Sequence, residues 1–292
     1  MKNNCVFLWI LSVVVVFGTS FADAKDSIKW IRISFPPFLV IENNKVSGLA
    51  IDIENVLREN MPEYEHIFTD SNIKRLHALL EEGNPCACAD YLIRTPAFEE
   101  KYYYSAYPAI ITPTHRIVIL KKNREKFGEG VRLSLKRLLE KPELKLGITA
   151  DRSFGKEVDD ILKTYAGAGN IYLHYSTTSI EGLIRMLLAG RVDYIIEYPP
   201  MVQYLEKQLG ASDELAVYAI EEKAQLWTPG WVACTKNELG KRVIEKVDTI
   251  LPGYILTEQF YQFAAQLVDV KLFPDFRDVY FKEMANPQPQ KK

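Results

Sequence analysis

The stretch GNPCACADYLIRTPAFEEKYYYSAYP, residues 83–108, decides how the rest of the chain is interpreted. The helical segment NIKRLHALLEEG leads into it and ends at Gly83, because glycine most easily adopts the left-handed conformation that follows a helix. A short strand of small residues, a polar turn with a helix start and an aromatic strand come next. This order predicts a ligand cleft at the carboxyl end of a parallel strand. An ordinary strand-to-helix connection with a tyrosine-rich packing strand is the alternative.

Strands and helices alternate along the rest of the chain. Residues 30–34, 64–69 and 144–149 have the pattern of strands, and residues 51–61 carry apolar side chains at helical spacing. We therefore expect an α/β fold built on mainly parallel sheets. The sequence contains no phosphate-binding glycine loop and no nucleophile or zinc motif of the common hydrolases.

Several strand ends and helix starts carry side chains suited to binding. Phe38 follows two prolines that end the first strand, and its ring either faces a ligand or fastens the loop to the core. Arg152 and Ser153 begin a helix, where backbone N–H groups attract anions. In the alternative interpretation Ser153 only caps that helix and Arg152 is solvated. Glu197 and Tyr198 end the buried strand RVDYIIEY.

The amino-terminal residues 1–24 have the pattern of a secretory signal. Lys2 precedes the apolar run VFLWILSVVVVF, and the small-x-small site at Ala22 and Ala24 follows it. We expect a soluble periplasmic protein that begins at Lys25, and a retained membrane anchor is the weaker alternative. At the other end, the polar tail ANPQPQKK predicts disorder from about residue 285.

The composition excludes several classes of partner. The formal net charge is −2, from 36 Lys and Arg against 38 Asp and Glu, so no basic surface indicates a nucleic acid. The four histidines show no ligand spacing with the cysteines, and we expect neither a metal nor another cofactor. The 16 tyrosines supply flat side chains that line pockets, although such side chains also fill cores.

Three cysteines remain once the amino-terminal segment is removed. Because an exported chain favours disulfides, we expect Cys234 to be bonded to Cys86 or to Cys88. A bond between Cys86 and Cys88 would be strained, since the two lie only two positions apart. Three buried free thiols are the alternative.

Four segments resemble the type 2 periplasmic solute-binding proteins, in particular the family 3 group that binds amino acids and similar solutes. They are the opening ISFPPFLVIENNKVSGLAIDIENVL, the helix and strand RTPAFEEKYYYSAYP, the strand and helix LKLGITADRSFGKEV, and LIRMLLAGRVDYIIEYPPMVQYL. The resemblance covers nearly all of residues 28–267. It implies two lobes that close on a small solute, with residues 25–112 and 230–292 in lobe 1 and residues 113–229 in lobe 2. It also implies a monomer that serves an inner-membrane ABC importer or a sensor, without stable insertion in the membrane.

The chain departs from the family's pattern at the positions that bind amino acids. The arginine that clamps the solute carboxylate aligns with Phe98, while Arg94 lies nearby but out of register. The aspartate that binds the amine aligns with Glu197, and a further aspartate aligns with Cys86. Phenylalanine cannot make the two-pronged contact of a guanidinium with a carboxylate. The resemblance therefore indicates a divergent subgroup in which Phe98 forms an aromatic wall.

The residues expected in the cleft come from spacing and from the resemblance together. They are Phe38, Tyr91, Arg94, Thr95, Phe98, Arg152, Ser153, Glu197, Tyr198 and Trp227. Two arginines against one glutamate predict a positive cleft, which favours a polar or anionic solute. We expect binding without catalysis, and no catalytic residue is assigned. The alternatives are a dehydratase-like enzyme that uses Glu197 as acid or base, and an envelope signalling module without a ligand.

Overall fold

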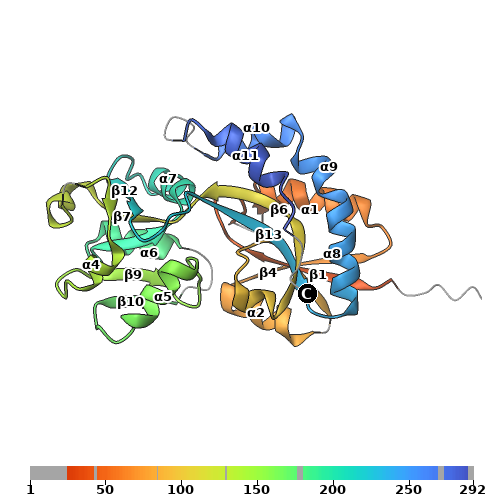
Figure 1. Ribbon diagram of the computed structural model, residues 1–292, viewed down its shortest axis with the longest axis horizontal. Helices are drawn as coiled ribbons and strands as arrows, with labels where there is room; N and C mark the ends of the chain where they lie inside the picture. Colours follow the sequence, from red (N-terminus) through yellow and green to blue (C-terminus); the bar gives the residue numbers. More distant parts are fainter. Residues whose placement is uncertain are drawn as a thin grey trace, which may run out of the picture.

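The computed structural model describes residues 25–42, 45–83, 85–128, 130–175, 180–268 and 273–288. The expected signal segment and the last residues of the tail lie outside these ranges. The described residues form two lobes that lie side by side and are joined by two long strands (Figure 1). This arrangement confirms the two-lobed α/β fold expected from the sequence.

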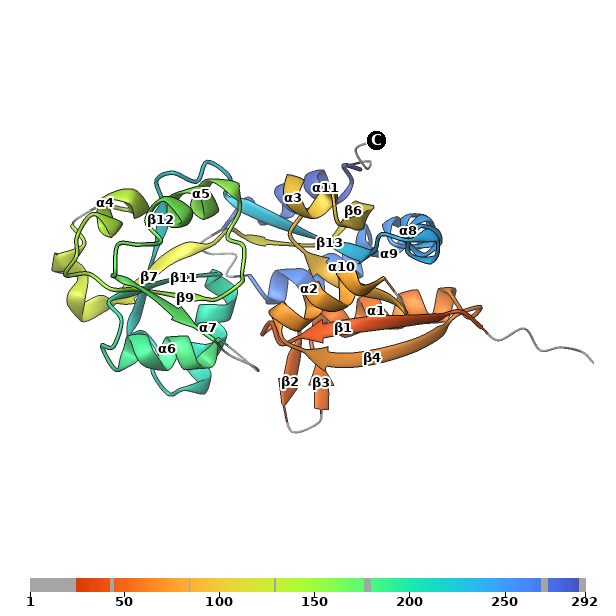
Figure 2. The same ribbon diagram turned by 90° about the horizontal axis from the view of Figure 1, so that it is seen from below.

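Lobe 1 is built on a five-stranded sheet. Its strands, in spatial order, are β4 (Glu65–Ser71), β1 (Ser27–Ile33), β5 (Cys86–Leu92), β13 (Trp227–Thr235) and β6 (Tyr102–Pro113). The first three run parallel, whereas β13 is antiparallel to both of its neighbours. A small hairpin of β2 (Val40–Glu42) and β3 (Lys45–Ser47) projects from this lobe (Figure 2).

Helices cover both faces of the first sheet, which explains the small residues of β5. The side chains of Cys86 and Cys88 pack against the helices of one face, and those of Ala87 and Ala89 pack against the other. α2 (Ile73–Glu82) covers the second face, and α3 (Pro96–Glu99) leads into β6. The helices of the first face are α1 (Leu49–Asn60), α8 (Glu238–Ile250), α9 (Pro252–Ile255), α10 (Glu258–Gln266) and α11 (Phe276–Met284).

Lobe 2 is built on a six-stranded sheet. The strand order is β10 (Ile171–His174), β9 (Leu146–Thr149), β11 (Tyr194–Glu197), β7 (Arg116–Leu120), β12 (Leu215–Ile220) and β8 (Arg132–Leu133). The 3-10 helix η1 (Lys121–Lys126) follows β7. One face packs against α4 (Leu135–Leu139) and α5 (Lys156–Thr164), and the other against α6 (Glu181–Leu188) and α7 (Pro199–Gln208). Each lobe therefore has its own hydrophobic core on both sides of its sheet.

The two strands β6 and β13 carry the chain between the lobes. They pair antiparallel from Tyr102 opposite Thr235 to Pro113 opposite Trp227. At the lobe boundary the hydroxyl of Thr228 donates to that of Thr114 over 2.9 Å, in a buried position. The boundary between the lobes that the sequence predicts, at residues 112–113 and 229–230, falls within these two strands. Its exact position stays a prediction.

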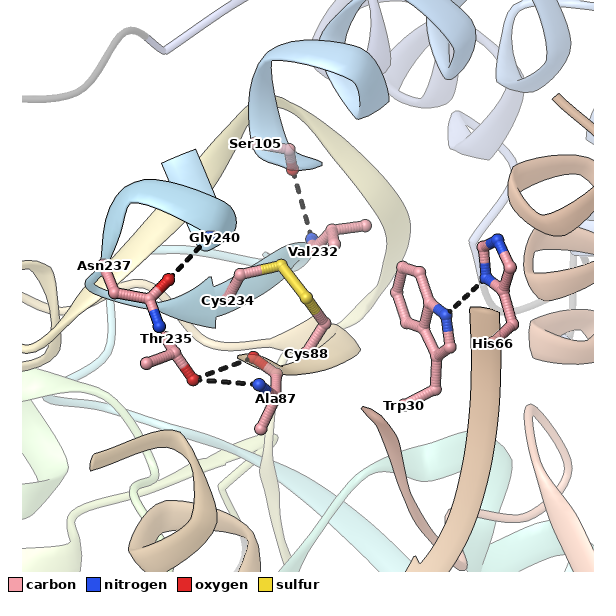
Figure 3. The surroundings of a disulfide bond; sticks show 10 residues. All are labelled: Trp30, His66, Ala87, Cys88, Ser105, Val232, Cys234, Thr235, Asn237 and Gly240. Carbon is pink, nitrogen blue, oxygen red and sulfur yellow. Dashed lines mark hydrogen bonds between the residues drawn. A yellow bond between two sulfur atoms is a disulfide. The ribbon is translucent and has the colours of Figure 1, made fainter. Parts of the chain in front are cut away.

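A disulfide bond joins Cys88 of β5 to Cys234 of β13, across the centre of lobe 1 (Figure 3). This confirms the expectation that Cys234 is bonded to one of the two cysteines of β5. Cys86 is free and buried. Next to the disulfide, the hydroxyl of Thr235 bonds to both the N–H and the carbonyl oxygen of Ala87. Covalent and polar contacts thus fix the same pair of strands.

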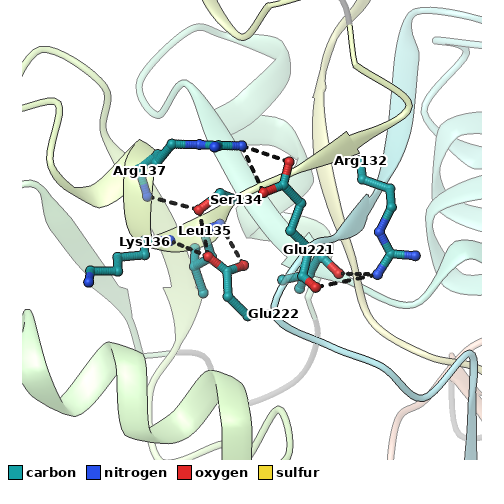
Figure 4. A network of polar contacts seen from close by, with 8 residues as sticks. Arg132, Ser134, Leu135, Lys136, Arg137, Glu221 and Glu222 are labelled. Carbon is teal, nitrogen blue, oxygen red and sulfur yellow. Dashed lines mark hydrogen bonds and ion pairs between the residues drawn. The ribbon is translucent and has the colours of Figure 1, made fainter.

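A carboxylate fixes the start of α4 in lobe 2 (Figure 4). Glu222 accepts hydrogen bonds from the hydroxyl of Ser134 and from the backbone N–H groups of Leu135 and Lys136. A carboxylate is favourable at a helix start because it satisfies N–H groups that lack partners within the helix. Glu222 lies in the segment that leads from β12 towards the second crossing, so this contact ties that segment to the core of lobe 2.

Candidate functional site

A cleft lies between the two lobes and takes side chains from both. On the lobe 1 side it lies at the carboxyl ends of β1, β4 and β5, and at the start of α2. On the lobe 2 side it lies at the end of β9 and at the residues that follow β9 and β11. The empty space measures about 930 Å³, including the part that opens to solvent. This position, outside the carboxyl ends of parallel strands, is the usual ligand site of an open α/β sheet.

Ring side chains form much of the wall. They are Phe35, His77, Tyr91, Phe98 and Tyr198. Phe35 stacks on Tyr91 with ring centroids 5.7 Å apart and meets Tyr198 of lobe 2 edge-on at 5.3 Å. His77 stacks on Phe98 at 4.8 Å. The cleft is therefore a mainly apolar and aromatic surface, and Phe35 is its contact between the lobes.

Arg152 and Glu197 form an ion pair at the lobe 2 side of the cleft. Nη1 and Nη2 of Arg152 donate to the two carboxylate oxygens of Glu197 over 2.7 and 2.9 Å, and the N–H of Tyr198 donates to one of them over 2.8 Å. Glu197 is fully buried, and burial raises the pKa of its carboxyl, whereas Arg152 lowers it. Because a guanidinium stays charged and holds both oxygens, the pair is ionised and neutral as a unit.

A buried histidine lies behind the cleft wall. The His115 ring lies 3.7 Å from the Tyr198 ring and 5.1 Å from Phe154, and it is fully buried. Among the described residues, neither of its nitrogens has a hydrogen-bond partner. Burial lowers the pKa of His115 well below its ordinary value, and the charges of Arg152 and Lys223 lower it further. His115 is therefore neutral, next to the crossing between the lobes.

Hydrogen bonds fix the loop between β9 and α5. The hydroxyl of Ser153 donates to the carboxylate of Asp159, which also accepts from the N–H of Phe154 over 2.7 Å. Lys223 donates to the carbonyl oxygen of Phe154 over 2.7 Å and is nearly buried. Ser153 does not cap α5, because the N-cap is Gly155 and no side chain accepts a capping hydrogen bond there. Its hydroxyl accepts from the N–H of Gly155 over 3.2 Å within the loop, and the residue lines the cleft.

No group of three or more His, Cys, Asp or Glu side chains within the described ranges has the arrangement of a metal site. Likewise, none of the helices described is long and apolar enough to cross a membrane.

Comparison with solved structures gives the same architecture. A histidine kinase sensor domain that resembles periplasmic binding proteins matches with a TM-score of 0.65 and 14% identity, over 84% of this chain and 96% of that one. An ancestral arginine-binding protein bound to arginine matches with a TM-score of 0.63 and 16% identity, over 83% and 98%. A substrate-binding protein of an amino acid ABC transporter from Streptococcus pneumoniae, bound to L-arginine, matches with a TM-score of 0.62 and 15% identity. The match covers 83% of this chain and 93% of that one. The chain has the fold of the periplasmic binding proteins. No family model and no curated protein matches its sequence.

Within this periplasmic-binding-protein fold, the interlobe cleft contains part of the residue set expected from the sequence. Tyr91, Phe98, Arg152, Ser153 and Tyr198 line it. Their role in binding stays a prediction, because the structure gives only their position.

The other expected residues do not line the cleft. Phe38 is buried in the lobe 1 core against Phe35. Thr95 caps α3 by accepting from the N–H of Phe98. Glu197 lies behind Arg152.

The last two expected residues outside the cleft lining, Trp227 and Arg94, have partners elsewhere in the protein. Trp227 packs on Phe273 and Phe276. Arg94 donates to Glu99 and to the carbonyl oxygen of Gln288. The expectation of a positive cleft counted two arginines against one glutamate, but Arg94 lies outside the cleft lining and Arg152 is paired with Glu197.

The structure adds cleft residues that the sequence did not reveal, in particular Phe35, His77 and Thr149. Phe35 adjoins the two prolines of the first strand end, and Thr149 ends the predicted strand 144–149. Their position at the ends of predicted strands is the sequence signal that could have identified both as cleft residues. His77 lies within a helix, where one polar residue on a partly exposed face carries no distinguishing pattern.

Proposed function

We propose that the protein is an extracytoplasmic solute-binding protein whose two lobes close on a small molecule. The observation that carries this proposal is the cleft lined by both lobes, at strand ends, with two long strands as the connection. Such a connection allows hinge-type closure around a ligand. The neighbours in fold include proteins described as substrate-binding proteins of amino acid ABC transporters, which supports the same role.

The partner is either an ABC importer or a sensor. A substrate-binding protein and a histidine kinase sensor domain both match this chain in fold. Export through the signal segment 1–24 remains part of the proposal. Amino-terminal sequencing of exported protein should give Lys25, and recovery of the intact leader in membranes would contradict it.

Binding fits the geometry better than catalysis does. One solved neighbour is described as an ancestral amino-acid-binding protein and a precursor of cyclohexadienyl dehydratase. Glu197, the acid or base that such an enzyme would use here, is fully buried, and Arg152 holds both of its oxygens. A carboxyl group in that position has no access to a solute in the cleft.

Small molecules released by denaturing natively purified protein test the proposal. We expect mass spectrometry to identify a compound that copurifies with the protein. When that compound is returned to stripped protein, small-angle scattering should show a smaller radius of gyration, because the lobes close. A protein that releases no compound in any preparation, and whose scattering is unchanged across a broad metabolite panel, would instead be a signalling module without a ligand.

A further inference from the structure

The charges around the cleft cancel within the protein. Arg152 is the one permanently charged side chain among the described residues that line the cleft. Glu197 accepts from it with both oxygens, so a solute meets a pair with no net charge. An anion bound there would add a negative charge without a counter-charge, and an uncompensated charge in a desolvated site is costly.

A cation finds no carboxylate in the described wall, and the charge of Asp151 acts on His77 from outside the lining. The described lining includes neither aspartate nor glutamate, and Glu197 is fully buried behind Arg152. A free ammonium group, such as that of an amino acid, would therefore lose its hydration without gaining a carboxylate. Both charged ends of a zwitterion are disfavoured for the same reason.

His77 lies in the wall, and its ring carries a hydrogen-bond acceptor. Its Nδ1 lies 3.0 Å from the hydroxyl of Tyr102, which in turn donates to Glu81 over 3.2 Å. A hydroxyl has a single hydrogen, so the Tyr102 oxygen accepts from Nδ1–H, and Nε2 is the acceptor of the ring. Burial lowers the pKa of His77 from its ordinary value, which keeps the ring neutral near neutral pH.

Flat apolar faces and an unused hydroxyl complete the wall. Two ring pairs, His77 on Phe98 and Phe35 on Tyr91, stack with interplanar angles of 24° and 17°. Stacked rings offer a further ring a large apolar contact at little entropic cost. The hydroxyl oxygen of Thr149 is buried without a hydrogen-bond partner among the described residues. Because Thr149 lines the cleft, a rotation of its side chain would bring this hydroxyl to a polar atom of a solute.

We propose that the cleft selects an uncharged solute that carries a flat ring and a hydroxyl or amide group. This inference rests on the solute-binding function proposed above and names the class of solute. It differs from the anionic solute that the sequence allowed beside a polar one, because that expectation counted Arg94 in the cleft, and Arg94 does not line it.

Four matched compounds test the preference for charge. L-phenylalanine, 3-phenylpropionate, phenethylamine and 3-phenylpropanamide share a phenyl ring on a two-carbon arm and differ in charge. Calorimetric titration of stripped wild-type protein should show the amide binding about tenfold more tightly than each charged compound, which is about 1.4 kcal/mol. Equal or tighter binding of any charged compound, or the absence of saturable binding of the amide, would overturn the inference.

Two variants test the physical origin of the preference. Glu197→Gln leaves the charge of Arg152 unbalanced, so 3-phenylpropionate should gain affinity relative to the amide by about tenfold. Phe98→Ala removes one stacking ring and should weaken amide binding about threefold to tenfold. Phe263→Ala, a partly exposed ring of α10 outside the cleft lining, is the matched control and should leave binding unchanged. If Glu197→Gln does not fold, the wild-type titrations still test the preference for an uncharged solute, and Phe98→Ala still tests the contribution of the ring.

The copurifying compound separates this inference from the proposed function. A released compound that is charged near neutral pH contradicts the inference and leaves the solute-binding function intact. The absence of any released compound, together with no binding of the four probes, contradicts the function itself.

Discussion

The guanidinium of Arg152 donates to both carboxylate oxygens of Glu197, 45 positions further along the chain. The two side chains come from the loop after β9 and from the end of β11, neighbouring parallel strands of lobe 2. Their pairing places a neutral unit where two separate charges would otherwise face the solute. The ion pair therefore affects both the charge that a solute meets in the cleft and the stability of lobe 2.

Loss of Arg152 should destabilise the protein strongly, because it leaves the buried Glu197 carboxylate without its counter-charge. We expect Arg152→Ala to lower the free energy of unfolding by about 3–5 kcal/mol, measured by urea denaturation. Arg137→Ala is the matched control, since its ion pair with Glu221 is exposed and should contribute less than about 1 kcal/mol. Equal small losses in both variants would show that the buried pair is not ionised.

Removal of the disulfide should also lower stability. Cys88 and Cys234 are 146 positions apart, so the bond restricts a long loop of the unfolded chain. Replacing both by alanine should cost about 2–5 kcal/mol in urea denaturation. Cys86→Ala, a buried cysteine of the same strand, is the control for lost packing alone and should cost distinctly less. Non-reducing peptide mapping should recover the Cys88–Cys234 linkage, and three alkylatable thiols in native protein would contradict it.

His115 should make the protein less stable in mild acid. Its folded pKa is lowered, chiefly by burial and further by Arg152 and Lys223, so below its unfolded pKa of about 6.5 only the unfolded chain binds the proton. The free energy of unfolding should therefore fall by about 1 kcal/mol from this group between about pH 6.5 and about pH 5.5. His115→Phe keeps a ring between Tyr198 and Phe154 and should remove this part of the slope.

The difference between the two pH curves reports on His115 alone, although other groups change the free energy of unfolding with pH in the opposite direction. Burial raises the pKa of Asp248 to about 6, so that carboxyl favours the folded state as pH falls. Its contribution is the same in wild type and variant and cancels in the difference. Parallel curves for the two proteins would show that folding does not lower the pKa of His115.

Local sequence signals predicted the end of α2, the central strand β5 and the disulfide of lobe 1. Gly83 ends α2 in the left-handed conformation at φ 82°, as its position after a helix predicted. The small residues of β5 pack between helices on both faces, and its cysteine pairs with Cys234. These features depend on the chain's local conformation and on residue size, which the sequence displays directly.

The partners of charged side chains could not be predicted in the same way. Arg94 and Arg152 both stand at strand ends, yet the first reaches Gln288 across 194 positions and the second Glu197. Local spacing does not determine which distant groups the two sheets bring within hydrogen-bond distance. Five of the expected residues lie in the cleft wall, whereas Arg94, on which the expected positive charge depended, does not.

In the proposed function, the cleft between the lobes holds a small solute. Native mass spectrometry of gently purified protein measures this without knowledge of the solute, as a mass above that of the denatured chain. We expect one bound compound in wild type and in the Phe263→Ala control, with a clearly smaller bound fraction in Phe98→Ala. Equal bound fractions in all three proteins, or no added mass in wild type, would contradict it.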